Sequence, residues 1–542
     1  MRTIIYVCLL MGLLPMACLA APVAERIYVQ TDKTFYLAGE QMQVKAYDVD
    51  LSFKLQDLSR ICYVELLDAE GAKLQAKIKM EEGTGYASLE IPFSTPSGMY
   101  ELVAYTRWMR NEGEQVFFRK PIAVFNSLRD ETKSRLVLTE DISSSSSFSK
   151  NVSHMDGNLE VSTDKKKYAC RQPVKIELGH IPVGASLAIS VVRQDVDLSC
   201  YTAIDFQQSL AGGHSFETQW LPELDGMIVE GKADGRVIHP NISIQGKDIQ
   251  FFAGQPTGNG GYSFYLPEQY GVKRMTTGME KEDSDGHIEL LSPFVASKGN
   301  VVDTLRIQRR YGKELLERSV ALQVEYIFAE NKTVIQSEAL PVYSFEPQQS
   351  YDLDEYKRFQ SLKETFIEFI PFITVLSLDG KERIGIFNKS DQTFGKGDAL
   401  VLLDGVVVMN HEDVLKYNPY LLKWVKVYEG KYAFGNQIYN GILALQTHEG
   451  TLPLFTLPDN SMQVEFQGLI QANDVVVGST GVKERNIPDF RHTLYWNPRV
   501  SDKDKEIRCI TSDMCGTYLV TIEGIGKNGK ILHGTCTFEV EK

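Results

Sequence analysis

The N-terminal part of the chain alternates apolar and polar residues with a period of two. In residues 27–125, runs such as 43–47 (QVKAY) and 63–67 (YVELL) are separated by Gly and Asp turns. A period of two with turn signals every ~8–12 residues is typical of a β-sandwich. The pattern therefore predicts a first β-sandwich domain over residues 21–126.

A segment at the start of this domain occurs a second time further along the chain. Residues 29–36 (VQTDKTFY) match residues 161–168 (VSTDKKKY) without a gap. Such a repeat predicts a second domain of the same kind. We place it at 158–221, with strand runs in 300–350 as candidates to complete it. Between the two domains lies a Ser-rich linker, 127–157, which cannot form a core.

The middle and the end of the chain continue with short strands. Residues 222–299 combine strand runs with turn glycines, which predicts a third, small β-sandwich. The connecting β segment 300–355 contains two more strand-like runs, 321–328 and 333–341. Residues 452–542 return to strand-like alternation and predict a C-terminal β domain.

Helical spacing of apolar residues appears in residues 356–451. Ser361 and Glu364 form a capping box ahead of a short apolar helix that Pro371 ends. Asn410 is a suitable N-cap for a second short helix. Short helices between strands predict a small α+β domain in this range.

The first twenty residues have the pattern of a secretory signal. Arg2 supplies a basic start, 4–14 is an apolar stretch, and Ala20 is a small residue at the expected cleavage point. Cys18 offers an alternative as a lipid-attachment site, although 15–17 (PMA) is a poor lipobox. We therefore expect an exported protein, in the periplasm or at the outer-membrane surface.

The net charge of the chain limits the classes of partner that it can bind. The chain has 57 Lys and Arg against 71 Asp and Glu, a net charge of -14. A nucleic-acid binder needs a positive surface to displace counterions from phosphates. No stretch beyond the signal reaches the ~18 apolar residues of a transmembrane helix. We expect neither a nucleic-acid partner nor a transmembrane segment of the mature chain.

Export also permits disulfide bonds. Candidate bridges are Cys170 with Cys200, and one pair among Cys509, Cys515 and Cys536. Spacing does not give the connectivity, and free buried thiols fit the same pattern.

Motifs for catalysis or metal binding are absent or incomplete in the sequence. Residues 524–529 spell GxGxxG, but a strand follows instead of a helix, so a hairpin turn is the better interpretation. Residues 282–287 (EDSDGH) resemble half a calcium loop, with Lys281 at the first ligand position and no closing glutamate. His411 and His448 fit surface or turn positions. We therefore expect no enzyme activity, no cofactor and no bound metal.

The repeated motif resembles the opening of the second macroglobulin domain of α2-macroglobulin-like proteins. The matching residues are Thr31, Asp32, Lys33, Tyr36, Gly39 and Glu40. The resemblance implies an immunoglobulin-like sandwich. Ala38 replaces a proline of the family pattern, and the second copy has Arg171 and Gln172 in place of Gly39 and Glu40. Macroglobulins that trap proteases covalently carry a Cys-x-Glu-Gln thioester, which no cysteine here matches.

Residues 400–450 resemble the plug domain of TonB-dependent outer-membrane receptors. The residues that carry this plug-like motif are Asp404, Gly405, Gly430, Gly435, Asn440 and Gly441. Residues 222–299 are similar, more weakly, to a carboxypeptidase-regulatory, transthyretin-like domain. With 488–498 (PDFRHTLYWNP), the order of segments is similar to macroglobulin-domain envelope proteins of Bacteroidota.

These resemblances imply a mainly β fold class: tandem immunoglobulin/macroglobulin-like β-sandwiches, a transthyretin-like β-sandwich and a plug-like α+β domain at 356–451. A receptor plug sits in a 22-stranded barrel, which needs at least ~200 residues. The residues after 450 are too few, so we expect the plug-like domain to act against a partner.

The favoured function is a non-enzymatic binding or scaffold protein of the cell envelope, docking through the plug-like domain onto an outer-membrane transporter or assembly. The alternative is a protease-binding protein without covalent capture, with the serine run 143–147 as its candidate cleavage segment. A hydrolase with carboxylates brought together across domains is a third option.

Overall fold

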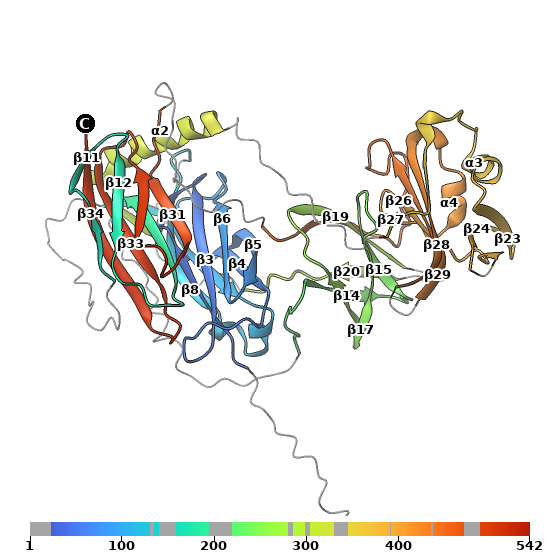
Figure 1. Cartoon of the computed structure of the whole chain (residues 1–542), viewed down its shortest axis with the longest axis horizontal. Coiled ribbons are helices and arrows are strands. Elements are labelled where there is room, and N and C mark those ends of the chain that lie inside the picture. Colours follow the sequence, from blue (N-terminus) through green and yellow to red (C-terminus); the bar gives the residue numbers. More distant parts are fainter. Residues whose placement is uncertain are drawn as a thin grey trace, which may run out of the picture.

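Strands dominate the structure, which is a computed structural model. It describes residues 23–129, 135–139, 159–194, 219–258, 260–279, 286–296, 298, 304–329, 345–390, 392–434, 437–470 and 488–542. The strands form several separate sheets, which confirms the mainly β fold class (Figure 1). Some predicted features lie outside the described residues: the signal 1–20, the serine run 143–147, Cys200, the strand run 333–341 and Gly435.

Sandwich A is formed by the first eight strands. They are β1 (Arg26–Thr31), β2 (Phe35–Leu37), β3 (Gln41–Val49), β4 (Ile61–Asp68), β5 (Gly71–Glu81), β6 (Thr84–Glu90), β7 (Gly98–Tyr105) and β8 (Phe118–Phe125). Their order is β1-β3-β6-β5-β4-β7-β8-β2. Only β2 and β8 pair in parallel; the other neighbours are antiparallel. Residues such as Tyr28, Val44 and Leu102 are fully buried in its core.

Sandwich B combines two distant parts of the chain. The first part gives β10 (Val161–Thr163), β11 (Lys167–Ala169), β12 (Pro173–Leu178) and β13 (Ser186–Arg193). The second gives β31 (Thr493–Val500), β32 (Glu506–Ile510), β33 (Gly516–Ile525) and β34 (Ile531–Glu541). The two sheets have the orders β10-β12-β32 and β11-β34-β33-β13-β31. Among the described residues, strands β31–β34 complete this sandwich and no strand of 300–350 joins it; the predicted run 333–341 lies outside the described residues.

Sandwich C lies between the other units in Figure 1 and also recruits a late strand. Its strands are β14 (Met227–Asp234), β15 (Pro240–Ile244), β16 (Phe251–Ala253), β17 (Gln255–Gly258), β18 (Gly261–Leu266), β19 (Val272–Met279), β20 (His287–Leu290) and β30 (Gln463–Gln467). They form two four-stranded sheets, β17-β18-β14-β20 and β16-β15-β19-β30. The predicted C-terminal domain 452–542 is thus divided between sandwiches C and B, because its strands complete sheets begun earlier.

Module D forms the end of the molecule opposite sandwich B (Figure 1). Its elements are β22 (Gln349–Asp352), α3 (Leu362–Phe369), β23 (Ile373–Leu378), β24 (Lys381–Asn388), β25 (Thr393–Phe394), β26 (Leu400–Leu403), β27 (Val406–Val407), α4 (His411–Leu415), β28 (Leu422–Phe434) and β29 (Gln437–Thr447). A five-stranded sheet, β22-β28-β29-β26-β27, accompanies the small sheet β23-β24-β25. Ser361 and Asn410 cap the two helices as predicted, with side chains that accept the N–H of Glu364 and Glu412.

The connecting segment packs against sandwich A. It contains β21 (Leu305–Gln308), which pairs in parallel with β9 (Leu136–Thr139) from the predicted linker, and helix α2 (Gly312–Ala329). The strand predicted at 321–328 lies within this helix and is wrong. Leu315 and Leu322 lie on the helix face that packs against sandwich A. A helix places both leucines on this face, whereas a strand over 321–328 would not include Leu315 in the contact.

Candidate binding surface

Asp404 of the plug-like motif is fully buried at the turn between β26 and β27. Its carboxylate accepts the N–H of Thr447 at 2.7 Å, the hydroxyl of Thr447 at 2.7 Å and the N–H of Leu452 at 2.9 Å. Hydrogen bonds of this number satisfy a buried carboxylate. Asp404 therefore ties the end of β29 to the β26–β27 turn, which is a structural role.

Two glycines of the motif permit close packing. Gly405 has φ +82°, and a β-carbon there would lie 2.9 Å from the carbonyl oxygen of Ile244 in sandwich C. Gly441 has φ +94°, and a β-carbon there would lie 2.7 Å from the side chain of Ile386 on β24. Both conformations disfavour other residues. A side chain at Gly405 would push module D away from sandwich C, and one at Gly441 would push β29 away from β24.

The other motif residues shape the long hairpin of β28 and β29. Gly430 lies at an irregularity of this ladder, between Tyr428 and Lys431. Asn440 donates a side-chain hydrogen bond to Asp398, and its N–H bonds the Asp398 carbonyl at 3.2 Å. The structure thus gives the described motif residues roles in folding module D rather than in lining one binding cavity.

Both histidines singled out in the sequence lie in module D. His411 is buried, so a surface position is wrong; its Nδ1 accepts the N–H of Ile384 at 2.9 Å. Burial, helped by the charge of Arg383, lowers the pKa of His411 to about 4. The ring is therefore neutral at physiological pH. His448 is half exposed and lies 3.0 Å from a carboxylate oxygen of Asp354.

The described cysteines are all free thiols in the structure. Cys170 lies 3.8 Å from Cys515, measured between the sulfur atoms. The pairing of Cys170 with Cys200 cannot be compared, because Cys200 lies outside the described residues. Cys509 is buried, which raises the pKa of its thiol to about 12, and Cys536 is half-buried.

The predicted hairpin turn at 524–529 is confirmed. Strands β33 and β34 pair from Gly516 to Ile525, and the N–H of Gly529 bonds the carbonyl of Gly526 at 2.9 Å. Within the described ranges, no group of three or more His, Cys, Asp or Glu side chains could hold a metal ion. None of the described helices is both long enough and apolar enough to cross a membrane.

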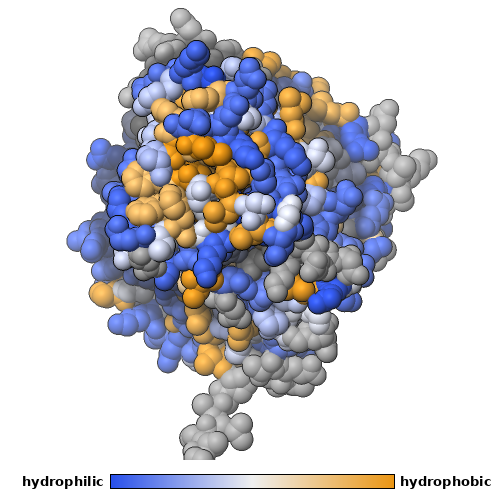
Figure 2. Space-filling model, turned by 90° about the vertical axis from the view of Figure 1, so that its right-hand side faces the viewer, coloured by the Kyte–Doolittle hydropathy of each residue, from blue (hydrophilic) through white to orange (hydrophobic). Residues whose placement is uncertain are grey.

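The free end of module D carries an apolar surface, which we call the tip patch. It consists of Ile367, Phe369, Phe372, Phe387 and Phe394. Ile367 is 53% exposed and Phe394 is 41% exposed, while the other three are half-buried. Figure 2 views this end of the molecule and shows apolar side chains gathered on it.

Ring contacts hold the aromatic members of the tip patch in place. Phe387 contacts Phe394 edge to face, with ring centroids 5.1 Å apart, and lies 6.4 Å from Phe372. The ring of Phe369 lies 4.5 Å from that of Tyr356. Lys389 covers one edge, with its ammonium 4.9 Å from the Phe372 ring centroid. The rings are therefore ordered before any partner binds.

Sequence reasoning missed this patch, although a signal was present. Leu362 and Phe366 occupy the core face of α3 and are fully buried. Ile367 lies off that face, where a polar residue is expected on a surface helix. The contribution of Phe394 depends on the pairing of β24 with β25, which spacing does not reveal.

No protein-family model matches the chain, and no curated protein matches it in sequence. Among solved structures it is similar to Salmonella α2-macroglobulin reacted with methylamine, at 10% identity and a TM-score of 0.22 over 96% of this chain and 40% of that one. Trypsin-activated α2-macroglobulin from Escherichia coli gives 9% identity and a TM-score of 0.24 over 96% and 41%.

The Escherichia coli adhesin FdeC gives 12% identity and a TM-score of 0.15, over 47% of this chain and 60% of that one. This chain spans about 40% of the length of the two macroglobulins. Similarity this low does not align individual residues, so no residue role is carried over from these proteins.

Proposed function

We propose that this chain is a non-enzymatic binding scaffold of the cell envelope that docks onto a partner protein through the tip patch. The observation that carries the proposal is a set of exposed and half-buried apolar side chains at the free end of module D, of which Phe372, Phe387 and Phe394 lie ring against ring. Exposed apolar patches on soluble domains mark interaction sites more often than chance.

The position of the patch supports docking. Module D lies at one end of the molecule, and sandwiches A and B lie at the other (Figure 1). A partner bound at the tip therefore leaves sandwiches A and B free for further contacts. Because the rings already contact one another, binding orders few side chains, which reduces its entropic cost.

The chemistry of the patch favours a protein partner with an apolar recess. Aromatic side chains are enriched among the residues that dominate binding energy at protein interfaces. The plug-like resemblance of 400–450 points to an outer-membrane β-barrel as that partner. Lys389, beside Phe372, already pairs with Glu429 at 2.9 Å, so recognition rests on the apolar side chains of the patch.

A photo-crosslinking residue at Glu368, which is exposed next to Ile367, tests the proposal in cells that carry this gene. We expect a covalent adduct with an outer-membrane β-barrel protein, identified by mass spectrometry. The double substitution Ile367→Asp and Phe394→Asp should weaken binding of that partner about 30-fold or more, as expected for loss of a dominant contact.

Leu316→Asp is the matched control, because Leu316 is an exposed leucine on α2, outside module D. This control should leave the adduct unchanged. An adduct that survives the double substitution, or no adduct with a β-barrel protein, contradicts docking through the tip patch. An adduct with a protease, together with cleavage of the chain, supports the protease-binding alternative instead.

A further inference from the structure

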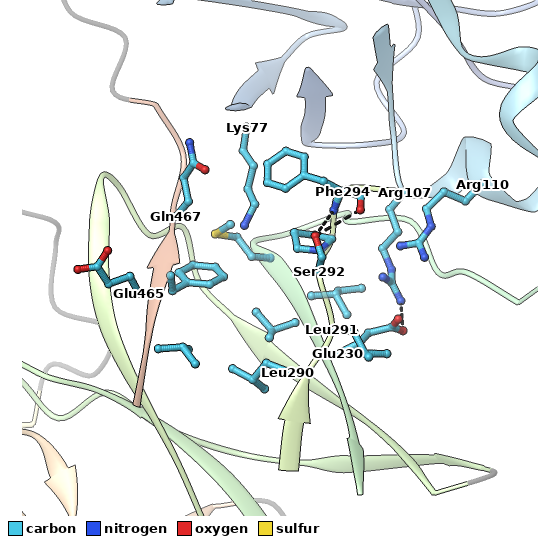
Figure 3. Close-up of a pocket in the computed structure, with 16 residues that line it drawn as sticks. Lys77, Arg107, Arg110, Glu230, Leu290, Leu291, Ser292, Phe294, Glu465 and Gln467 are labelled. Carbon is cyan, nitrogen blue, oxygen red and sulfur yellow. Dashed lines mark hydrogen bonds and ion pairs between the residues drawn. The ribbon is translucent and has the colours of Figure 1, made fainter. Parts of the chain in front are cut away.

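A cavity of about 310 Å³ lies between sandwiches A and C, away from the tip patch. Sandwich A contributes Lys77 on β5, and Arg107 and Arg110 just after β7. Sandwich C contributes the remaining walls from β14, from β20 and the segment after it, and from β30 (Figure 3). Pockets of roughly 300 Å³ or more are large enough for small-molecule ligands.

Lys77 presents a buried cation to this cavity. Its ammonium lies 4.1 Å from the ring centroid of Phe466 and 5.9 Å from that of Phe294. Among the described residues, no carboxylate lies within ion-pair distance of it. Burial lowers the pKa of Lys77 to about 8, so the side chain remains mostly charged at neutral pH. The charge of the buried Glu223 offsets part of the cost of burying Lys77. Because no described carboxylate contacts the ammonium directly, the cavity leaves a place for an anionic ligand.

A second cationic group lines the wall opposite the β30 side of the cavity (Figure 3). Arg107 forms an ion pair with Glu230, and its charge is thereby balanced. Arg110 stacks on Trp220, with its guanidinium 3.5 Å from the ring centroid, and has no carboxylate partner among the described residues. The carboxylate of Glu465 points away from Lys77 in Figure 3. Lys77 and Arg110 are thus the cations of the lining that form no ion pair with a described residue, although the charges of Glu223 and Glu230 act on them at longer range.

Most of the remaining lining is apolar, apart from Ser292, Glu465 and Gln467. Its aliphatic and aromatic members are Met227, Ile228, Val229, Leu290, Leu291, Phe294, Val464 and Phe466. Apolar walls with a few placed charges select a ligand with an apolar body and one polar end. A wall of this kind favours a hydrocarbon chain over a phosphate or a sugar.

We infer that this cavity binds an apolar carboxylate, with the carboxylate on Lys77 and the hydrocarbon part against Leu290 and Val464. Two sources share this chemistry: a free fatty acid, and the C-terminal residue of an apolar peptide. The inference stands independently of the tip patch, because the two sites share no residue.

Calorimetric titration of the full chain with octanoate and with N-acetyl-leucyl-leucine tests the inference and distinguishes the sources. We expect at least one of them to bind and octyltrimethylammonium not to bind. Lys77→Met should weaken the bound carboxylate about 10- to 100-fold, the usual range for a lost hydrogen bond to a charged group. Lys232→Met is the matched control, because Lys232 is an exposed lysine on β14, outside the cavity lining.

A second substitution shows whether a loss of binding in Lys77→Met reflects the lost charge or a folding defect. Leu290→Trp fills the cavity from the sandwich C side and leaves Lys77 in place, so it should also abolish binding. The inference is overturned if neither carboxylate binds, if octyltrimethylammonium binds equally well, or if Lys77→Met binds as tightly as Lys232→Met.

Discussion

The two copies of the Thr-Asp-Lys motif fold identically and yet have different surroundings. Asp32 accepts the hydroxyl of Tyr36 at 2.7 Å and the N–H of Gln43 at 3.0 Å. In the second copy, Asp164 accepts the hydroxyl of Tyr168 at 2.6 Å and a backbone N–H, that of Lys175, at 3.0 Å. In both copies the motif threonine also bonds the lysine carbonyl at 2.7 Å.

The difference lies in what packs on the motif. Asp32 is buried, and its second oxygen accepts the hydroxyl of Thr493 from sandwich B at 2.9 Å. Asp164 is exposed. The hydrogen bonds within the motif therefore set the turn between two strands in both copies. Whether the motif is buried depends on the neighbouring domain.

The residues next to the motif have diverged with their surroundings. In sandwich A, Glu40 binds the buried Arg318 of α2 through two contacts of 2.7 and 2.6 Å. In sandwich B, Gln172 occupies the position of Glu40, and Arg171 pairs instead with Asp513, at 2.7 and 2.6 Å. The first copy thus anchors a helix, and the second joins two turns of its own sandwich.

The largest expected effect comes from breaking the helix anchor. Arg318→Met leaves the buried Glu40 carboxylate with Lys33 at 3.3 Å and the N–H of Leu37 at 3.2 Å, but without its bidentate partner. We expect a loss of about 4 kcal/mol in the free energy of unfolding, the usual cost of removing one partner of a buried ion pair. Arg171→Met, on the half-buried pair of the second copy, should cost far less. Urea titration of both variants measures the difference.

The same anchor gives a pH signature. Although burial alone would raise the pKa of Glu40, the charges of Arg318 and Lys33 hold it at about 2, below its ordinary 4.5. A carboxyl with a lowered folded pKa stabilises the protein above pH 4.5 and loses that contribution as the pH falls toward 2. The native chain should lose stability across this window, and Arg318→Met should lose much less.

Breaking the motif itself should have the next largest effect. Asp32→Ala removes the acceptor shared by Tyr36, Gln43 and Thr493, of which Tyr36 keeps the carbonyl of Lys33 at 2.8 Å. Because buried unsatisfied groups cost about 1–3 kcal/mol each, we expect a total loss of about 3 kcal/mol. Asp164→Ala, where water can replace the carboxylate, should lose about 1 kcal/mol or less. Equal losses for the two variants would show that burial does not distinguish the copies.

The cysteine pair of the second copy should give a slightly smaller effect in the opposite direction. Cys170 occupies the position of Ala38, and its partner Cys515 is 345 residues away in the chain. Oxidised glutathione, by taking two electrons from the two thiols, should join them and stabilise sandwich B by about 2–3 kcal/mol. Peptide mapping without reductant checks the bond, and Cys170→Ser, which should gain nothing from oxidation, is the control.

The smallest effect concerns Lys45 and the corresponding residue of the second copy, Glu177. Lys45 is buried between sandwiches A and B, where it donates hydrogen bonds to Ser186 Oγ at 2.8 Å and to the carbonyl of Leu187 at 3.1 Å. Burial lowers its pKa from 10.5 to about 7. The charged form therefore destabilises the folded state below pH 7, and this penalty is relieved as the pH rises from 7 to 10.5.

Lys45→Met should consequently be more stable than the native chain by about 1 kcal/mol at pH 6. The advantage should shrink as the pH rises toward 10.5. Glu177 is exposed, so Glu177→Met should preserve the native pH dependence. Thermal unfolding at pH 6, 8 and 10 measures both variants, and a gap that does not change with pH would contradict the role of the Lys45 charge.

Part of the candidate site could be predicted from the sequence, and part could not. The helix caps at Ser361 and Asn410 were correct because a cap involves residues only two or three positions apart. Asp404 was singled out as part of a plug-like motif, but its structural role depends on Thr447 and Leu452, which only the folded sheet brings to it. The tip patch depends on strand pairing, and the cavity depends on the contact of two sandwiches.

Helix α2 shows why local pattern fails in places. Its sequence from 321 to 328 alternates well enough to predict a strand, but Leu315, Arg318 and Leu322 share one helical face. The deciding contact is with Glu40 and the edge of sandwich A, far away in the chain. Tertiary packing therefore overrides a weak local preference.

The sequence alone determined the features that depend on residues close together along the chain. These are the strand periodicity, the repeated motif, the hairpin at 524–529 and the two capped helices. Only the tertiary structure decided that β31–β34 complete sandwich B, that β30 completes sandwich C, and which lysines are buried. The physical reason is that strands pair through backbone groups, which every segment has. The apolar and polar pattern of one strand therefore does not identify a partner strand that is distant in the chain.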